Sequence, residues 1–138
     1  MRFADTNVLL YAISRDPGEA AKARQANEIL AARDIGLSVQ VLQEFYIQAT
    51  RLSRPDPLSH EQAVGLIEAW RRFPVQETTT DVMVAALATR RRFGISYWDA
   101  AIIEACRSLG GAVVLSEDLD TGTDYDGVRV ENPFRAGT

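Results

Sequence analysis

The chain has 138 residues, of which 46% are hydrophobic and 25% charged, with a formal net charge of −4. This size and composition fit one soluble domain, residues 1–138, and exclude disordered and disulfide-rich classes of chain. The lone cysteine, Cys106, cannot pair within the chain, which favours a reducing compartment and a buried apolar role. No targeting signal and no run of roughly 20 apolar residues is present, so we expect a cytoplasmic protein.

In the first half of the chain, short apolar runs alternate with helices that follow capping residues. Thr6 and Asn7 suit one helix start, Asp16 before Pro17 suits a second, and Ser38 suits a third. The expected elements are, in order, strand 2–4, helix 8–13, helix 18–33, strand 36–37 and helix 39–52.

The second half continues this alternation. Ser59 and Gln62 have the spacing of a capping box, Thr80 is expected to cap the next helix before Gly94, and Ser96 starts another. The expected elements are a helix from residue 60 that ends at Pro74, strand 75–78, helix 81–93, helix 96–109, strand 112–115 and strand 128–130. Strands that alternate with helices predict a three-layer α/β/α domain with a short, mostly parallel central sheet.

Four acidic residues stand beside or within apolar segments: Asp5, Glu44, Asp99 and Asp118. Asp5 ends the first strand and Asp118 follows strand 112–115, so both belong at the sheet edge where α/β domains bind ligands. A carboxylate buried alone is costly, and a shared divalent cation would explain the set. Mg²⁺ prefers oxygen ligands and promotes the hydrolysis of phosphodiesters.

Each acid also has a purely structural interpretation. Asp5 can cap the helix that follows it, and Asp99 stands three residues after Ser96, as in a capping box. Asp118 can belong to a simple turn, and Glu44 can point to water. An acid can cap a helix and bind a metal at once, so both interpretations stay open.

Helical spacing also makes predictions about the core. Glu44 shares a helix face with Val41 and Ile47, which places this acid among core residues. Met83 and Leu87, together with the aromatic residues at helical spacing, are expected in the core.

Short polar residues adjoin the acids, and arginines cluster elsewhere. Thr6, Asn7 and Ser116 can surround and orient the acids of a metal site, or they can serve only as helix caps and turn formers. The arginines at 90–92 end a helix, where positive charge complements the helix dipole, but arginine also binds phosphate. The weak candidates for substrate binding are therefore Arg90, Arg91 and Arg92.

Other chemistries lack their residues. The only histidine, His60, begins a helix that looks like a surface helix, so acid–base, Ser-His-Asp and Cys-His sites are poor hypotheses. No cluster of zinc ligands and no glycine-rich phosphate loop is present. The only lysine, Lys22, lies in the middle of the second expected helix, which argues against an aspartyl-phosphate site.

Four segments together resemble the motifs of the PIN domain family. They are Phe-Ala-Asp-Thr-Asn-Val-Leu-Leu-Tyr at 3–11, Gln-Glu-Phe at 43–45, Ser-Tyr-Trp-Asp-Ala-Ala-Ile at 96–102 and Leu-Ser-Glu-Asp-Leu at 115–119. Their order and spacing match across nearly the whole chain. The length and the closing segment 128–134 resemble the VapC toxins of bacterial type II toxin–antitoxin systems.

The resemblance implies a Rossmann-like PIN fold and a Mg²⁺- or Mn²⁺-dependent endoribonuclease. Such proteins are usually homodimers held inactive by a VapB-type antitoxin, and relatives cut transfer, ribosomal or messenger RNA. The resemblance assigns Asp5, Glu44, Asp99 and Asp118 to the family's acids, with Asp5 and Asp99 as direct metal ligands. Because Glu117 and Asp120 flank Asp118, the identity of the fourth acid stays open.

A second hypothesis, from another class of function, is a non-catalytic PIN-like module that binds RNA or a protein partner. The presence of all four acids argues against it, since a pure binding module does not need them.

Overall fold

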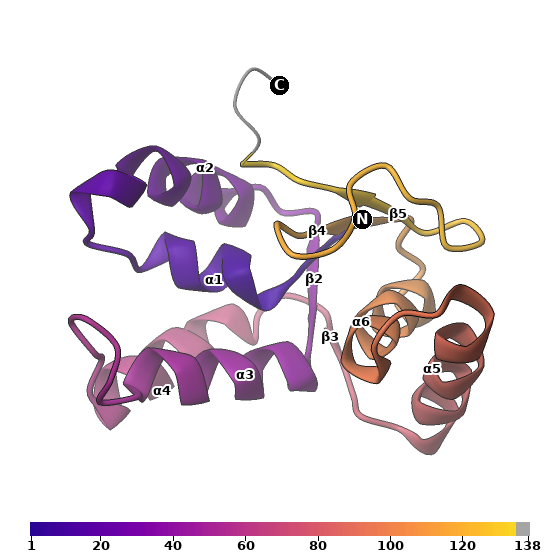
Figure 1. Ribbon diagram of the computed structural model, residues 1–138. Helices are drawn as coiled ribbons and strands as arrows, with labels where there is room; N and C mark the ends of the chain where they lie inside the picture. Colours follow the sequence, from indigo (N-terminus) through magenta and orange to yellow (C-terminus); the bar gives the residue numbers. More distant parts are fainter. Residues whose placement is uncertain (135–138) are drawn as a thin grey trace.

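A five-stranded parallel sheet organises the fold, in the spatial order β3-β2-β1-β4-β5 (Figure 1). The structure is a computed structural model that describes residues 1–134. The strands are β1 (Arg2–Ala4), β2 (Ile35–Ser38), β3 (Val75–Gln76), β4 (Val113–Leu115) and β5 (Arg129–Glu131). All of their pairings within the sheet are parallel, as the alternation of strands and helices predicted.

Helices cover both faces of this sheet. They are α1 (Thr6–Ala12), α2 (Ala20–Ala31, after a 3₁₀ turn over Pro17–Glu19), α3 (Val39–Thr50), α4 (His60–Trp70), α5 (Thr80–Phe93) and α6 (Tyr97–Ser108). In Figure 1, α1 to α4 lie on one side of the sheet, and α5 and α6 on the other. This confirms the predicted three-layer α/β/α class.

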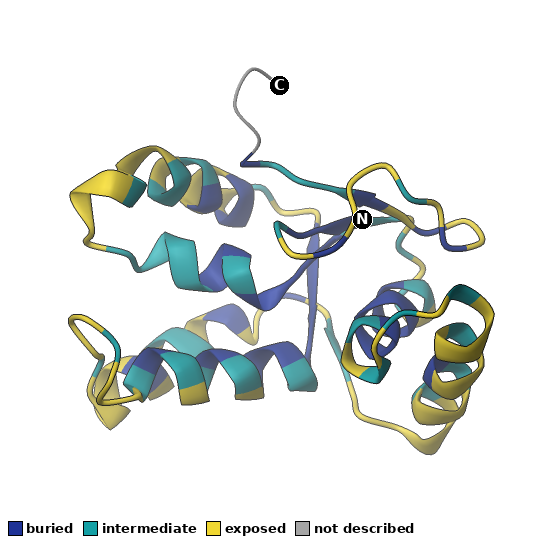
Figure 2. Cartoon of the chain, viewed as in Figure 1, coloured by how far each residue is buried: buried dark blue, intermediate teal, exposed yellow. Residues whose placement is uncertain are grey.

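The core lies between the sheet and its helices (Figure 2). Phe3, Val114 and Val130 are fully buried on neighbouring strands, as expected for short strands covered on both faces. Helix α6 is the most buried helix and packs directly on the sheet. It carries Cys106, which is fully buried, and burial raises the pKa of this thiol to about 11. The buried apolar role predicted for Cys106 is confirmed.

Most of the predicted helix starts are confirmed. Side chains of Ser38 and Ser96 cap their helices, and Ser59 and Gln62 form a complete capping box. Asp16 caps the 3₁₀ turn that precedes α2, and α2 itself begins at Ala20 without a side-chain cap. Gly94 has φ 70°, the left-handed conformation expected of a residue after a helix end.

Two predicted starts were wrong by a short distance. Asp5, and neither Thr6 nor Asn7, caps α1, so the helix begins at residue 6 and not at residue 8. Thr79 and not Thr80 caps α5, because its hydroxyl accepts a hydrogen bond from the amide of Val82. In both cases neighbouring residues have equal capping ability, and only the path of the chain selects one of them.

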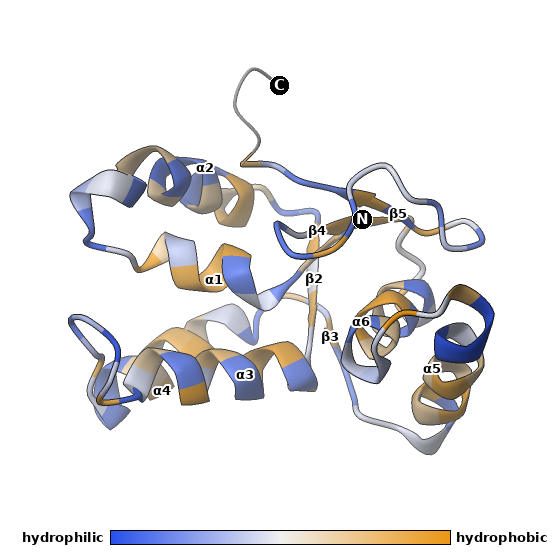
Figure 3. Cartoon of the chain, viewed as in Figure 1, coloured by the Kyte–Doolittle hydropathy of each residue, from blue (hydrophilic) through white to orange (hydrophobic). Residues whose placement is uncertain are grey.

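The expected core assignments on α3 and α5 were wrong in part, although Val41 on α3 is fully buried as expected. Ile47, Met83 and Leu87 are exposed, and so is Trp98. Helix α5 lies on the outer side of α6 and buries its alanine face, with Ala86 fully covered, so its larger apolar residues point outward. Figure 3 shows hydrophobic colour on α5, a helix that Figure 2 shows as largely exposed. In the described part of the chain, none of the helices combines the length and apolar character needed to cross a membrane.

Candidate active site

The candidate site lies where β1 and β4 end side by side. Ala4 and Leu115 are register partners, and the amide of Asp5 donates to the carbonyl of Leu115 at 3.0 Å. The chain turns from β1 toward β2 on one side, and after β3 it crosses to β4 on the other. This reversal of strand order is the point where open α/β sheets bind ligands. We call Asp5, Glu44, Asp99 and Asp118, which surround this point, the acidic rim.

Asp5 is the most deeply placed acid of the rim, with 8% of its surface exposed. Its Oδ1 accepts from the Thr6 amide at 2.7 Å, and its Oδ2 accepts from the Ser116 hydroxyl at 2.7 Å. Burial raises the pKa of Asp5 from 3.8 to about 6, with smaller contributions from the charges of Glu44 and Asp118, while its two hydrogen bonds oppose the rise. The side chain is therefore fixed in place, and within residues 1–134 it takes part in none of the ion pairs.

Glu44 reaches the rim from α3. Its Oε2 accepts from the Thr6 hydroxyl at 2.8 Å, and its Oε1 accepts from the Gln40 amide at 3.0 Å. Gln40 also donates to the carbonyl of Trp98 at 3.4 Å, which ties α3 to the start of α6. Glu44 is half-buried and not embedded in the core, which corrects the expectation based on Val41 and Ile47.

Asp99 reaches the rim from the first turn of α6. Its amide donates to the Ser96 hydroxyl at 3.1 Å, so the predicted cap is present. Burial raises the pKa of Asp99, a hydrogen bond from the Ser96 side chain to its carboxyl group opposes the rise, and the charges of Asp118 and Glu44 add to it. Because Glu44 and Asp118 repel both Asp5 and Asp99, all four acids share one electrostatic environment.

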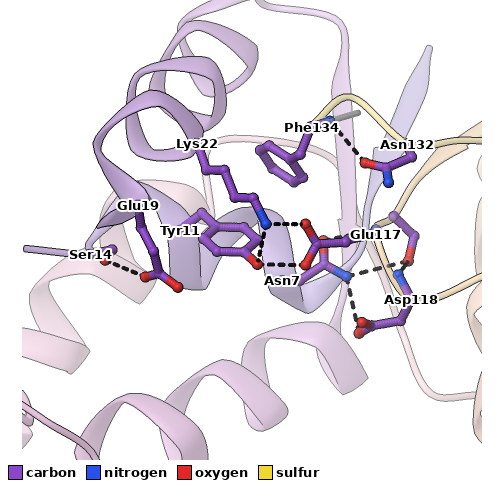
Figure 4. A network of polar contacts seen from close by, with 10 residues as sticks. Asn7, Tyr11, Ser14, Glu19, Lys22, Glu117, Asp118, Asn132 and Phe134 are labelled. Atoms are coloured by element: carbon purple, nitrogen blue, oxygen red, sulfur yellow. Dashed lines mark hydrogen bonds and ion pairs between the residues drawn. The ribbon is translucent and has the colours of Figure 1, made fainter. Parts of the chain in front are cut away.

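Asp118 is the exposed member of the rim. Its Oδ2 accepts from the Asn7 amide at 3.2 Å, and its own backbone amide donates to the Ser116 hydroxyl at 3.1 Å. The neighbouring Glu117 instead pairs with Lys22, at 2.6 Å between Nζ and Oε2 (Figure 4). Of these two adjacent acids, the structure brings Asp118 and not Glu117 to the rim.

The polar residues expected to support the acids lie among them. Thr6 links Asp5 and Glu44, because its amide donates to one and its hydroxyl to the other. Ser116 donates to Asp5 and accepts from Asn7 at 3.3 Å. These three side chains thus join Asp5, Glu44 and Asp118 into one hydrogen-bonded network.

A divalent cation fits the chemistry of this rim. All four side chains offer oxygen ligands, which Mg²⁺ and Mn²⁺ accept. In residues 1–134 the ion pairs use other carboxylates, and none of them includes an acid of the rim. In that same range, no three Asp, Glu, His or Cys side chains are grouped closely enough to hold a metal ion among them as they stand. The oxygen donors of the rim thus suit a cation in their chemistry. To bind one together, the four acids would have to move closer to each other.

The arginines at the end of α5 lie elsewhere. Arg92 pairs with Asp126 at 3.1 Å and lies over the ring of Phe93, and Arg90 and Arg91 are exposed. The structure shows no contact between these side chains and the rim, among the contacts of the described residues.

Two partners of the site were not found from the sequence. Gln40 precedes Glu44 by four residues, a spacing that brings side chains together on a helix and gave a usable signal. Lys22 was considered only as a catalytic lysine and rejected, and its pairing with Glu117 had no local signal because 95 positions separate them.

Comparisons with known proteins identify the family and the fold. The family model of the PIN domain matches residues 2–122. No curated protein matched the sequence. Among solved structures, a toxin–antitoxin complex from Klebsiella pneumoniae is similar, with 18% identity, a TM-score of 0.70, and coverage of 97% of this chain and 98% of that one.

Two further solved structures share the fold. VapC20 from Mycobacterium tuberculosis, described as a toxin that cleaves the sarcin–ricin loop, has 21% identity and a TM-score of 0.66, covering 86% of this chain and 92% of that one. VapBC2 from Rickettsia felis, bound to a DNA fragment from its promoter, has 15% identity and a TM-score of 0.65, covering 95% and 97%. At these identities the likeness establishes the fold.

Proposed function

The chain belongs to the PIN domain family, and from this premise we propose that it is a Mg²⁺-dependent endoribonuclease, with Mn²⁺ as a possible substitute. It would hydrolyse RNA phosphodiester bonds as the toxin of a VapBC-type system. One observation carries the proposal: four carboxylates share the rim between β1 and β4, and none of them has a basic partner among the described ion pairs.

We assign a role to each of the four acids from its surroundings in the site. Asp5 and Asp99 are the proposed direct ligands, since both have pKa values raised by burial and by neighbouring carboxylates, a situation that a cation relieves. When bound, a divalent ion supplies positive charge for the phosphate oxygens and lowers the pKa of a coordinated water. Glu44 and Asp118 would complete the site by orienting water and accepting its proton.

The toxin role rests on the solved structures that share the fold. They include toxin–antitoxin complexes, and one is described as a toxin that cleaves the sarcin–ricin loop. We therefore propose a VapB-type antitoxin as the protein partner and RNA as the substrate. The exposed apolar side chains of α5 support a homodimer, since adjacent exposed apolar residues favour association.

Cleavage of RNA by the purified protein tests the activity. We expect cleavage in Mg²⁺ or Mn²⁺, its loss in EDTA, and a decrease of more than about 100-fold in Asp5→Asn, because a direct ligand matters more than an outer partner. Asp34→Asn is the matched control: Asp34 pairs with Arg2 at the opposite end of β1, so this variant should keep full activity. Circular dichroism should show that both variants are folded.

Two results would contradict the proposed nuclease activity. One is cleavage that EDTA does not diminish, and the other is full activity of Asp5→Asn. The toxin role has a separate test in growth arrest after controlled expression, with sequencing of the RNA ends and Asp5→Asn as the inactive control.

One observation favours a non-catalytic module that binds RNA or protein. Within residues 1–134, the acids are not grouped tightly enough to hold a metal as they stand. A protein that binds several RNA pools but cleaves none of them in either metal would support this alternative.

A further inference from the structure

A second polar cluster lies beside the acidic rim (Figure 4). Lys22, on α2, donates from Nζ to Glu117 Oε2 at 2.6 Å and to the Tyr11 hydroxyl at 3.1 Å. The same ammonium lies 4.7 Å from the centroid of the Tyr11 ring, and the Tyr11 hydroxyl donates to the other oxygen of Glu117. We call Tyr11, Lys22 and Glu117 the lysine cluster. It joins α1, α2 and the turn after β4.

The lysine cluster binds both carboxylate oxygens of Glu117, one through Tyr11 and one through Lys22. Burial alone would raise the pKa of Glu117, but the hydrogen bonds from Lys22 and Tyr11 outweigh it and lower the pKa below its ordinary value. Glu117 thus differs from Asp5, whose pKa is raised by burial. Lys22 satisfies one acid of the turn and leaves its neighbour without an ion pair among those described.

The turn that carries Glu117 also carries Asp118, so the position of one acid affects the other. The Asn7 amide group contacts both adjacent acids: its Oδ1 accepts from the Glu117 backbone amide at 3.3 Å, and its Nδ2 donates to Asp118 Oδ2 at 3.2 Å. The Ser116 hydroxyl accepts from the backbone amides of Asp118 and Leu119, at 3.1 and 3.3 Å. A rotation of this turn would therefore move Asp118 and disturb Ser116, which holds Asp5.

An aromatic contact closes the lysine cluster on its other side. The rings of Tyr11 and Phe134 meet edge to face, with centroids 4.8 Å apart, and Phe134 is buried. Asn132 fixes this end by accepting from the Phe134 amide at 2.8 Å. The Tyr11 ring is thus held by Lys22 and by Phe134, and has little freedom to follow Glu117 if the turn shifts.

We propose that Lys22 is a positioning residue for the candidate metal centre: by binding Glu117 against Tyr11, it fixes the turn so that Asp118, and not Glu117, is presented to Asp5. This inference rests on the proposed function for its consequence in metal binding. A partly exposed ion pair of this kind contributes little to global stability, so its loss should act on the site more than on the fold.

The variants are Lys22→Met, Lys22→Arg and Glu117→Gln, with Arg2→Met as a matched control. Arg2 and Asp34 form a pair of similar length, 2.7 Å, and their side chains are 34% and 46% exposed, against 36% and 27% for Lys22 and Glu117. That pair lies at the opposite end of β1.

Two readouts address the positioning role. Hydrogen exchange of the Asp118 and Leu119 amides should increase in Lys22→Met, because their acceptor Ser116 is no longer held in register. The dissociation constant for Mn²⁺, measured by electron paramagnetic resonance, should rise by about 10-fold, as for other losses of an outer partner. Lys22→Arg should restore most of both properties, and Arg2→Met should change neither.

A double variant tests whether Lys22 acts through Glu117. Lys22→Met with Glu117→Gln should weaken Mn²⁺ binding no further than the stronger single variant does, because both changes remove one interaction. Effects that multiply would overturn the proposal. So would parental exchange and Mn²⁺ affinity in Lys22→Met, or equal losses in Arg2→Met.

The two proposals fail in different ways. If the unmodified protein neither binds Mn²⁺ nor cleaves RNA, the proposed function fails, and with it the metal-directed role of Lys22. If the protein does both and Lys22→Met behaves like it, only the positioning role fails.

Discussion

Asp5 serves two purposes with its two oxygens. Oδ1 caps α1 through the Thr6 amide, and Oδ2 is bound by the Ser116 hydroxyl at the edge of the sheet. Asp99 likewise belongs to a capped first turn and to the rim. The structural interpretation of these acids is therefore correct. It leaves room for the functional interpretation, because a carboxylate that caps a helix still has free lone pairs.

The raised pKa of Asp5 predicts how stability depends on pH. Its folded pKa is about 6 and its ordinary value 3.8, so between these values the unfolded chain ionises first and the free energy of unfolding falls as pH rises. The loss is complete above the folded pKa and amounts to roughly 3 kcal/mol, at about 1.4 kcal/mol per pKa unit. Urea denaturation in EDTA at pH 4.5 and 7.5 should show Asp5→Asn gaining on the parent at the higher pH.

The metal supplies the control for this experiment. Saturating Mg²⁺ should return much of the lost stability to the parent at pH 7.5, because a cation at the rim favours the charged carboxylate, and should do little for Asp5→Asn. A parent and a variant with the same dependence on pH would contradict the assignment of a buried, uncompensated charge to Asp5.

The residues of the rim could be read from the sequence to different degrees. Asp5 and Asp118 follow recognisable strands, so elementary topology placed them at one edge. Lys22 could not be read, because its partner Glu117 is 95 positions away and their contact depends on how α2 packs. The choice between Glu117 and Asp118 needed that same contact.

Helix starts were the most predictable elements, because capping is a local interaction. Ser38, Ser59 and Ser96 each accept from an amide three residues later, within a single turn. Strand limits were less predictable. β3 is two residues long where four were expected, and β2 is four where two were expected, since a strand extends only where a neighbour pairs with it.

The cap of α6 yields a prediction at this scale. Ser96→Ala removes the hydroxyl that accepts from the Asp99 amide, which should cost about 1 kcal/mol of stability. The Ser96 side chain also lowers the pKa of Asp99 by hydrogen bonding to its carboxyl group, so its loss should raise that pKa, and RNA cleavage should fall at a higher pH on acidification than in the parent. The measurement is the rate of cleavage as a function of pH, beside chemical denaturation.

Ser59→Ala is the control for this prediction. Ser59 caps α4 through the amide of Gln62, so its loss should cost a similar stability. It should leave the pH profile of cleavage unchanged, because the rim lies on other elements. If both variants shift the profile equally, the effect comes from lowered stability and not from Asp99.

The arrangement of the whole molecule was predictable as a class but not in detail. The alternation of elements predicted a parallel sheet between helices. Only the structure gave the strand order, and with it the place between β1 and β4 where that order reverses. Helix α5 shows why burial was misjudged. It is apolar on two faces, and only packing against α6 decides which one is covered.

The uncovered face of α5 leads to a prediction about assembly. Met83, Val84 and Leu87 are exposed and lie within one turn of each other, which favours association between copies of the chain. A charge introduced there would have to be buried in the dimer, so Leu87→Glu should raise the dimer dissociation constant by more than about 10-fold. Sedimentation velocity over a range of concentrations measures this constant directly.

Leu52→Glu is the matched control. Leu52 is 92% exposed in the turn between α3 and α4, so this variant introduces the same charge away from α5. A dimer that survives Leu87→Glu but dissociates in Leu52→Glu would move the interface to that turn, and a monomeric parent would remove the homodimer from the proposed function.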